Sequence, residues 1–114
     1  MYVSTELFQR LGISDQVKGK SRVIPGTPVA ESVARGEAEI GFQQVSELLP
    51  VAGVDFVGPL PPEVQKITVF SAGVVAGSKV EAPSRTLIKF LASPAAFRAI
   101  TSSGLEPIPA AVPK

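Results

Sequence analysis

Residues 33–48 read Val-Ala-Arg-Gly-Glu-Ala-Glu-Ile-Gly-Phe-Gln-Gln-Val-Ser-Glu-Leu, and this stretch decides the fold expected for the chain. Val33 and Ala34 are predicted to end a short helix, because Gly36 follows as a residue that can adopt the left-handed conformation of many helix ends. Residues 38–42 then place apolar side chains at every second position, which is the period of a strand. The stretch therefore predicts a helix–strand unit of an α/β protein.

Two polar residues, Gln43 and Gln44, come directly after the predicted strand. Ligands of open α/β sheets bind beyond the carboxyl ends of the strands, so two uncharged hydrogen-bonding side chains at that position suit a ligand site. A plain surface turn accounts for the same residues equally well. The sequence alone leaves both interpretations open.

The elements around this stretch are predicted from their ends and their apolar periods. Gly26-Thr27-Pro28 offers a hydroxyl that can cap a helix and a proline suited to its first position, so a helix is predicted over 28–35. Ser14 and Asp15 are predicted to cap a short turn. Further helices are predicted over 2–11, 45–49, 83–92 and 94–103, and further strands over 22–24, 54–57 and 66–76. Ser93 and Pro94 are predicted as the N-cap and first position of the last helix, and Gly104 as its end.

The strand predicted over 66–76 is nearly continuous in apolar residues, which is typical of a strand buried on both faces. The order of elements is unusual, however, because the chain opens with a helix where an α/β layer normally begins with a strand. We therefore expect an α/β fold with a mixed sheet flanked by helices, completed by oligomerisation or by strand or domain swapping. A homo-oligomer is predicted.

Composition narrows the classes of function. Eleven basic and ten acidic residues give a net charge of +1, so no global charge favours nucleic acid as a partner. The chain has no cysteine and no histidine, which removes disulfides, thiol catalysis and the commonest general base and metal ligand. We expect no enzyme activity, no cofactor and no metal site. The chain shows neither a signal peptide nor an apolar run of the roughly 20 residues that span a bilayer.

Three apparent motifs are set aside. Gly19-Lys20-Ser21 resembles the end of a P-loop, but Ser14 stands where the motif requires its first glycine, and no strand precedes the loop. Lys18, Lys20 and Arg22 have no aromatic residues between them, so they indicate a solvated basic loop. Glu37 and Glu39 share one side of the predicted strand without a further catalytic group nearby, which favours a water-facing strand side.

Four segments carry a resemblance to a known family. The helix–glycine–strand unit of 34–42, the Gly-Pro-Leu-Pro loop of 58–61, the Phe-Ser-Ala-Gly strand of 70–73, and 91–96 followed by 104–107 occur in order over nearly the whole chain. Together they resemble the C-terminal half of molybdate-type substrate-binding proteins of ABC transporters, which have the type 2 periplasmic binding fold. The resemblance implies a partial periplasmic-binding-protein-like lobe that forms a single compact unit. Residues 1–65 would be a second-lobe-like α/β segment, and residues 66–114 the crossing strand and the C-terminal helices that return towards the first lobe.

The resemblance also implies site residues. Such proteins hold an oxyanion between two lobes, largely with backbone N–H groups and hydroxyls. Gln43 aligns with a position that offers a backbone amide, and Phe70 aligns with a tyrosine whose hydroxyl reaches the anion. Because Phe70 cannot donate a hydrogen bond, either the ligand differs, or Gln44, Thr68 or Ser71 replaces that contact, or Phe70 is simply a core aromatic residue. The candidate ligand-binding residues are Gln43, Gln44, Phe70 and Ser71.

The function implied is that of a solute-binding protein fragment. The parent family would bind a small oxyanion or related solute in the interlobe cleft and pass it to an ABC permease, in the periplasm. Tight molybdate binding is not expected from one half of such a cleft, because hydrogen bonds to a solvated anion contribute less than those in a closed site. The alternative hypothesis is a truncated, stand-alone α/β interaction module that self-associates without tight ligand binding.

Overall fold

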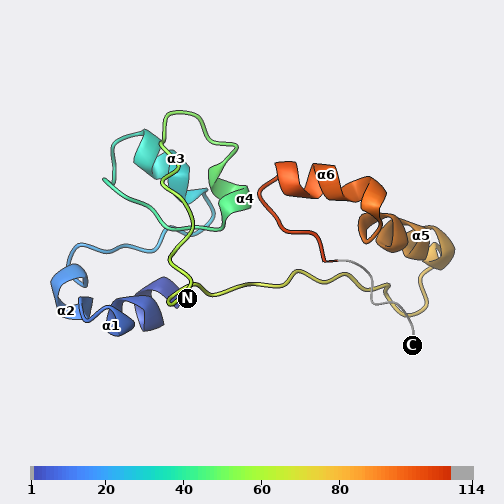
Figure 1. Ribbon diagram of the computed structural model, residues 1–114, viewed down its shortest axis with the longest axis horizontal. Coiled ribbons are helices and arrows are strands. Elements are labelled where there is room, and N and C mark those ends of the chain that lie inside the picture. Colours follow the sequence, from blue (N-terminus) through green and yellow to red (C-terminus); the bar gives the residue numbers. More distant parts are fainter. Residues whose placement is uncertain (1, 109–114) are drawn as a thin grey trace. The chain divides into compact units, whose positions relative to one another are not determined.

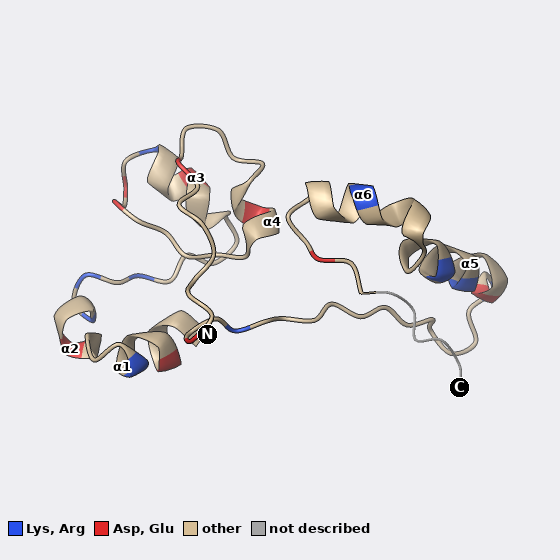
Figure 2. Ribbon diagram, viewed as in Figure 1, with Lys and Arg blue, Asp and Glu red and all other residues tan. Residues whose placement is uncertain are grey.

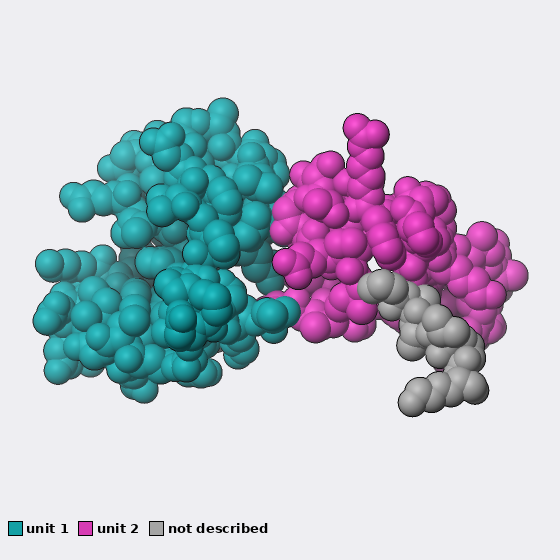
Figure 3. Space-filling view, in the orientation of Figure 1, with its two compact units in different colours: residues 1–67 teal, residues 68–114 magenta. Residues whose placement is uncertain are grey.

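A computed structural model describes residues 2–108 as helices joined by extended segments and turns (Figure 1). The chain divides into two compact units, Met1–Ile67 and Thr68–Lys114 (Figure 3). The helices are a π-helical turn η1 (Val3–Leu7), α1 (Phe8–Arg10), α2 (Ser14–Val17), α3 (Val29–Ala34), α4 (Val45–Leu48), α5 (Glu81–Leu91) and α6 (Pro94–Ser102). These helices overlap every helix predicted from the sequence.

The glycines predicted to end helices do so. Gly36 has φ +76°, its N–H donates to the carbonyl of Val33 at 2.9 Å, and the N–H of Glu37 donates to the carbonyl of Ser32 at 3.0 Å. This hydrogen-bond pair defines a Schellman motif, in which a left-handed residue turns the chain out of the helix. Gly104, with φ +88°, ends α6 in the same way.

The prediction of a mixed sheet flanked by helices is wrong for the part of the chain that the structure describes. Residues 22–24, 38–42, 54–57 and 66–76 were predicted as strands, but no strand occurs between residues 2 and 108. A strand becomes part of a sheet only when a neighbour satisfies its N–H and C=O groups, and the alternation of side chains contains no information about that neighbour.

The segment 66–76 shows the consequence most clearly. It was expected to be buried on both faces, yet Ile67 is 80% exposed and Val75 is 79% exposed. Without a neighbouring strand or a covering helix, its apolar side chains face solvent. The segment is rich in apolar residues, as its sequence shows, but the burial inferred from that composition is absent.

Residues 1–67 bury few apolar side chains. Among the described residues of this unit, the buried apolar side chains are Leu7, at 1% exposure, and Ala30, at 2%. The ring of Phe42 meets the ring of Phe8 edge to face, with centroids 6.2 Å apart and an interplanar angle of 79°. The segment predicted as a strand over 38–42 is therefore held against the first helical region by an aromatic pair of a kind that adds about 0.5–1.5 kcal/mol beyond area burial.

Residues 68–114 contain the two longest helices, α5 and α6, which contact each other. Ser93 occupies the N-cap position of α6 and Pro94 its first position, as predicted. Ala96 of α6 is 3% exposed. On α5, Arg85 and Glu81 form an ion pair at 2.9 Å, one helical turn apart.

The chain exposes more surface than a folded domain of its mass. Its accessible surface is 9261 Å². For 11.9 kDa, the scaling of accessible area with mass gives about 6,000 Å² for one compact domain and about 7,200 Å² for two separate halves. The exposed large apolar side chains contribute to this excess, among them Val57 of the first unit, at 94%, and Val75 of the second, at 79%.

No helix among the described residues is long and apolar enough to cross a membrane.

Candidate functional site

The turn that carries Gln43 and Gln44 is fixed against α3 by close packing at Gly41. A Cβ atom on Gly41 would lie 2.7 Å from Cγ1 of Val29 and 3.0 Å from Cγ2 of Val33. Contacts that short do not occur in proteins without displacement of one partner. Glycine at this position therefore lets the backbone lie directly on the apolar face of α3 and sets where the next residues go.

Gln43 lies at the beginning of α3. Its Oε1 accepts a hydrogen bond from the backbone N–H of Val29 at 2.9 Å, across 14 positions of sequence. The side chain thereby satisfies one of the N–H groups that the first turn of a helix leaves without an intrahelical partner. Thr27 was predicted to supply such a cap, but Pro28 is the N-cap residue and its own side chain makes no capping bond.

Gln44 precedes α4 as its N-cap residue. Its backbone is extended, with φ −60° and ψ 144°, and its carbonyl accepts from the N–H groups of Glu47 and Leu48 at 2.9 and 3.2 Å. Its side chain is exposed and makes no capping bond. Gln43 and Gln44 thus lie in one turn between two helices. Both residues are exposed, and the Gln43 side chain is bonded to the backbone of α3.

Phe70 and Ser71 belong to the other unit and lie in its extended segment. The Phe70 ring is 64% exposed, so it is not a core residue of this structure. Ser71 is exposed as well. A ligand-binding role for these two residues, and for Gln43 and Gln44, stays a prediction.

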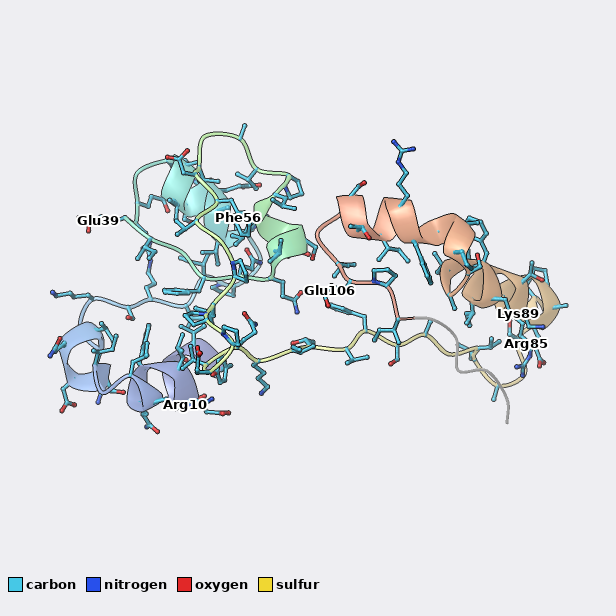
Figure 4. All side chains as sticks on the ribbon, viewed as in Figure 1. Arg10, Glu39, Phe56, Arg85, Lys89 and Glu106 are labelled. Atoms are coloured by element: carbon cyan, nitrogen blue, oxygen red, sulfur yellow. The ribbon has the colours of Figure 1, made fainter. Side chains whose placement is uncertain are left out.

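Basic and acidic residues gather at and after the end of α3 (Figure 2), and they form a network of ion pairs. Nε of Arg35 is 2.7 Å from Oε1 of Glu37, and Arg22 and Glu31 extend the network at 3.6 and 3.7 Å. The hydrogen bond from Arg35, followed by its charge and that of Arg22, lowers the pKa of Glu37 against an opposing effect of desolvation. The same hydrogen bond raises the pKa of Arg35. Glu37 is therefore held ionised by arginines. Both Glu37 and Glu39 are exposed, and Glu39 is labelled in Figure 4.

A second cationic cluster was not foreseen from the sequence. Arg10, labelled in Figure 4, donates from Nη2 to the carbonyl of Glu63 at 2.9 Å and from Nη1 to the Tyr2 hydroxyl oxygen at 3.3 Å. The Tyr2 hydroxyl in turn donates to the carbonyl of Val64. Nζ of Lys66 lies 5.5 Å from the centroid of the Tyr2 ring, within the range of a cation–π contact.

The sequence held only part of the signal for this cluster. Tyr2 and Arg10 are eight positions apart, about two helical turns, and both fall in the helix predicted over 2–11. Lys66 and the carbonyls of residues 63 and 64 come from more than 50 positions further along the chain. No local pattern could have joined these residues to Tyr2.

A shallow hollow of about 260 Å³ is lined by Gln9, Gly12, Ser14 and Asp15. The buried Oγ of Ser14 has no hydrogen-bond partner within residues 2–108. Over the same range, no three His, Cys, Asp or Glu side chains lie close enough to hold a metal ion. None of the four predicted ligand residues lines this hollow.

Comparison with known proteins shows the family. Residues 2–106 match the model of a family described as bacterial extracellular solute-binding protein, and the chain belongs to that family. A protein named aconitate isomerase, from Pseudomonas sp, is 46% identical over 110 residues, which are 96% of this chain and 42% of the relative. The chain therefore spans less than half the length of this curated relative. No solved structure matches the chain significantly.

The prediction of a solute-binding protein is confirmed at the level of the family, which implies a small solute as ligand. The family's description as extracellular also agrees with a location outside the cytoplasm. The narrower statements, that the chain is of the molybdate type and is a C-terminal half, stay predictions.

The prediction that the chain is not an enzyme is contradicted by the relative, whose name is that of an isomerase. The error has a chemical reason. The absence of histidine and cysteine excludes the reactions that need those two side chains, but carboxylates, lysine and tyrosine also transfer protons in enzymes.

Proposed function

We propose that this chain is part of a solute-binding protein that takes aconitate as its ligand and interconverts aconitate isomers. The observation that carries the proposal is the 46% identity over 96% of the chain to a relative named aconitate isomerase. Identity spread along nearly the whole chain supports a shared ligand more strongly than a shared fold does, because one fold can serve many functions.

The chemistry of aconitate fits a binding protein that uses few special residues. Aconitate has three carboxylates and a methylene group next to both a carboxylate and the carbon–carbon double bond. When a base removes one methylene proton, the negative charge spreads over the allyl system and the former double bond can rotate. Return of the proton gives the other isomer, so atoms and electrons balance without a co-reactant. Such a step needs a base and fixed positive charge near the developing anion.

The predicted ligand residues fit a carboxylate at least as well as molybdate. Gln43 and Gln44 offer amide groups, and Ser71 offers a hydroxyl, which are common partners of carboxylate oxygens. Phe70 stands where a molybdate-type protein would have a tyrosine hydroxyl, so the missing donor argues for a different ligand. A ligand-binding role for each of these four residues is part of the proposal. Residues 1–65 would form the second-lobe segment, and residues 66–114 the extended crossing segment and the helices after it.

The test is a chimera in which this chain replaces the 110 matched residues of the relative. Conversion of trans-aconitate would be followed by ¹H NMR of its vinylic proton. Turnover within tenfold of the relative's own rate is expected. A folded chimera without turnover, measured beside an active relative, would contradict the proposal.

A second function is favoured by the family's description as extracellular solute-binding protein. In that case the protein lies in the periplasm and hands its solute to an ABC permease. A thermal-shift comparison separates the ligands, since a ligand at 100 times its Kd stabilises the native state by about 2.7 kcal/mol. Stabilisation of the chimera by aconitate without turnover would favour transport. Stabilisation by molybdate but not by aconitate would favour the oxyanion binder.

Self-association is also proposed, because of the apolar side chains that both units expose. Val57 of the first unit is 94% exposed and Val75 of the second unit is 79% exposed, whereas soluble monomers seldom leave such residues uncovered in clusters. Light scattering of the 114-residue chain should report a mass of at least two copies. A monomer at micromolar concentration would contradict self-association.

A further inference from the structure

The basic side chains of the chain divide into two groups by their partners. Arg22, Arg35 and Arg85 each form an ion pair with a glutamate. The remaining basic residues between 2 and 108 have no described carboxylate within 4.0 Å, and they are Arg10, Lys18, Lys20, Lys66, Lys79, Lys89 and Arg98. Arg10 and Lys66 differ from the others in the second group because both contact the side chain of Tyr2.

Arg10 is held in place without being neutralised. Its two hydrogen bonds in the described structure go to the Glu63 carbonyl and the Tyr2 hydroxyl oxygen, which are neutral acceptors. A guanidinium has five N–H donors, so about three stay available for a further acceptor. A cation with a fixed orientation and free donors binds a carboxylate with less loss of side-chain entropy than a mobile one.

Lys66 adds a second charge at the same aromatic ring. Its ammonium lies 5.5 Å from the Tyr2 centroid, while the Tyr2 hydroxyl is bonded to Arg10 at one side and to the Val64 carbonyl at the other. Glu6 and Glu63 are the acidic residues nearest to this cluster in sequence, and neither forms an ion pair with Arg10 or Lys66. Two like charges at one ring repel each other, and an anion that contacts both would relieve that repulsion.

We propose that Tyr2, Arg10 and Lys66 form a binding site for a small polycarboxylate. Arg10 would take one carboxylate through its free N–H donors, and Lys66 would take a second carboxylate of the same molecule. Charge-assisted hydrogen bonds of this kind are roughly twice as strong as neutral ones, and arginine suits them because its planar fork matches the carboxylate. This proposal rests on the proposed function, because it takes the ligand to be of the same class, a tricarboxylate, and names Arg10 and Lys66 as the positive charges that bind it.

The experiment is a titration of the 114-residue chain with tricarballylate, a saturated tricarboxylate that cannot be isomerised, followed by ¹H–¹⁵N NMR. We expect the Nε–H signal of Arg10 and the backbone amides of residues 2, 10 and 63–66 to move with one common Kd. A sodium chloride titration at matched ionic strength should leave these signals in place. Movement at other residues alone, or at none, overturns the proposal.

Variants separate binding from folding. Arg10→Gln and Lys66→Gln should each weaken tricarballylate at least fivefold, whereas Arg10→Lys should recover part of the affinity because it keeps the charge. Lys18→Gln removes an unpaired basic residue away from Tyr2 and serves as the matched control, with an unchanged Kd. If Lys66→Gln binds tricarballylate as tightly as the unchanged chain, the proposed site is contradicted. The cluster then only joins residues 63–66 to the first helices.

The two proposals can fail separately. If a chimera binds tricarballylate at the cluster but does not turn over aconitate, the isomerase function is contradicted and the binding site is supported. If turnover of aconitate is unaffected by Arg10→Gln and Lys66→Gln together, the isomerase function is supported and the binding site is contradicted.

Discussion

Gly41 is the residue at which the turn bearing Gln43 comes closest to α3. Because a Cβ atom there would lie 2.7 Å from Cγ1 of Val29, Gly41→Ala should destabilise the chain by about 1–3 kcal/mol, the usual cost of overpacking. Urea unfolding followed by circular dichroism would measure the change.

The control is Gly19→Ala, since a Cβ atom on Gly19 meets nothing within 4 Å. Its effect should stay within about 0.5 kcal/mol. Val29→Ala removes the clashing methyl group, so the double variant should lose less stability than the two single changes add up to. Strict additivity would argue against the clash.

Glu37 is the residue whose ionisation the fold controls most clearly. The hydrogen bond and charge of Arg35 lower its pKa in the folded state, so the folded protein holds the ionised form more firmly than the unfolded chain does. The stabilisation from this pair is therefore complete above the ordinary pKa of a glutamate, about 4.3, and is lost as the pH falls through the lower folded value. An NMR titration of the Glu37 carboxyl carbon should give a pKa below the ordinary value of a glutamate.

Arg35→Gln removes the largest cause of this shift, so the pKa of Glu37 should rise. Lys18→Gln, which removes a charge without an ion pair to Glu37, should leave it in place. A pKa of Glu37 that ignores Arg35→Gln would contradict the ion pair seen in the structure.

At the scale of elements, α3 depends on a residue outside itself for its first hydrogen bond. Gln43→Ala removes the acceptor of the Val29 N–H and should cost about 0.5–2 kcal/mol, as the loss of other N-terminal caps does. Gln43→Glu keeps an acceptor and places negative charge at the helix N-terminus, so it should restore most of that stability. Gln44→Ala is the matched control, because its side chain caps nothing.

Helix ends that depend on glycine or proline were predictable from the sequence, whereas contacts between distant segments were not. The helix ends at Gly36 and Gly104 and the helix start at Ser93-Pro94 were predictable, because they depend on the φ values that glycine and proline allow. The cap of α3 was not, since Thr27 and Gln43 both have suitable oxygens and only the path of the chain brings one of them to Val29. Strand pairing failed as a prediction for the same reason, because a partner can come from anywhere.

At the scale of the whole molecule, the extended segment 68–76 contrasts with the helices that follow it. Its backbone groups make no ladder in the described chain, whereas α5 has the hydrogen bonds of a helix. Hydrogen exchange should therefore be fast over 68–76 and slower over 81–91. In the chimera with the relative, protection of 68–76 should rise if that segment pairs as a strand there. Equal protection of both regions in the isolated chain would contradict the absence of pairing.

The sequence by itself determined the positions of the helices, the glycine ends of α3 and α6, the apolar character of the extended segments and the family, because these depend on local backbone preferences and on residue order. Only the tertiary structure decided that Gln43 caps α3, that Gly41 lies against Val29, and that Arg10 and Lys66 meet at Tyr2. Apart from Arg10 and Tyr2, which are eight positions apart, those contacts join residues between 12 and 64 positions apart in the sequence. Their formation depends on where the folded backbone runs, and no pattern within one element carries that information.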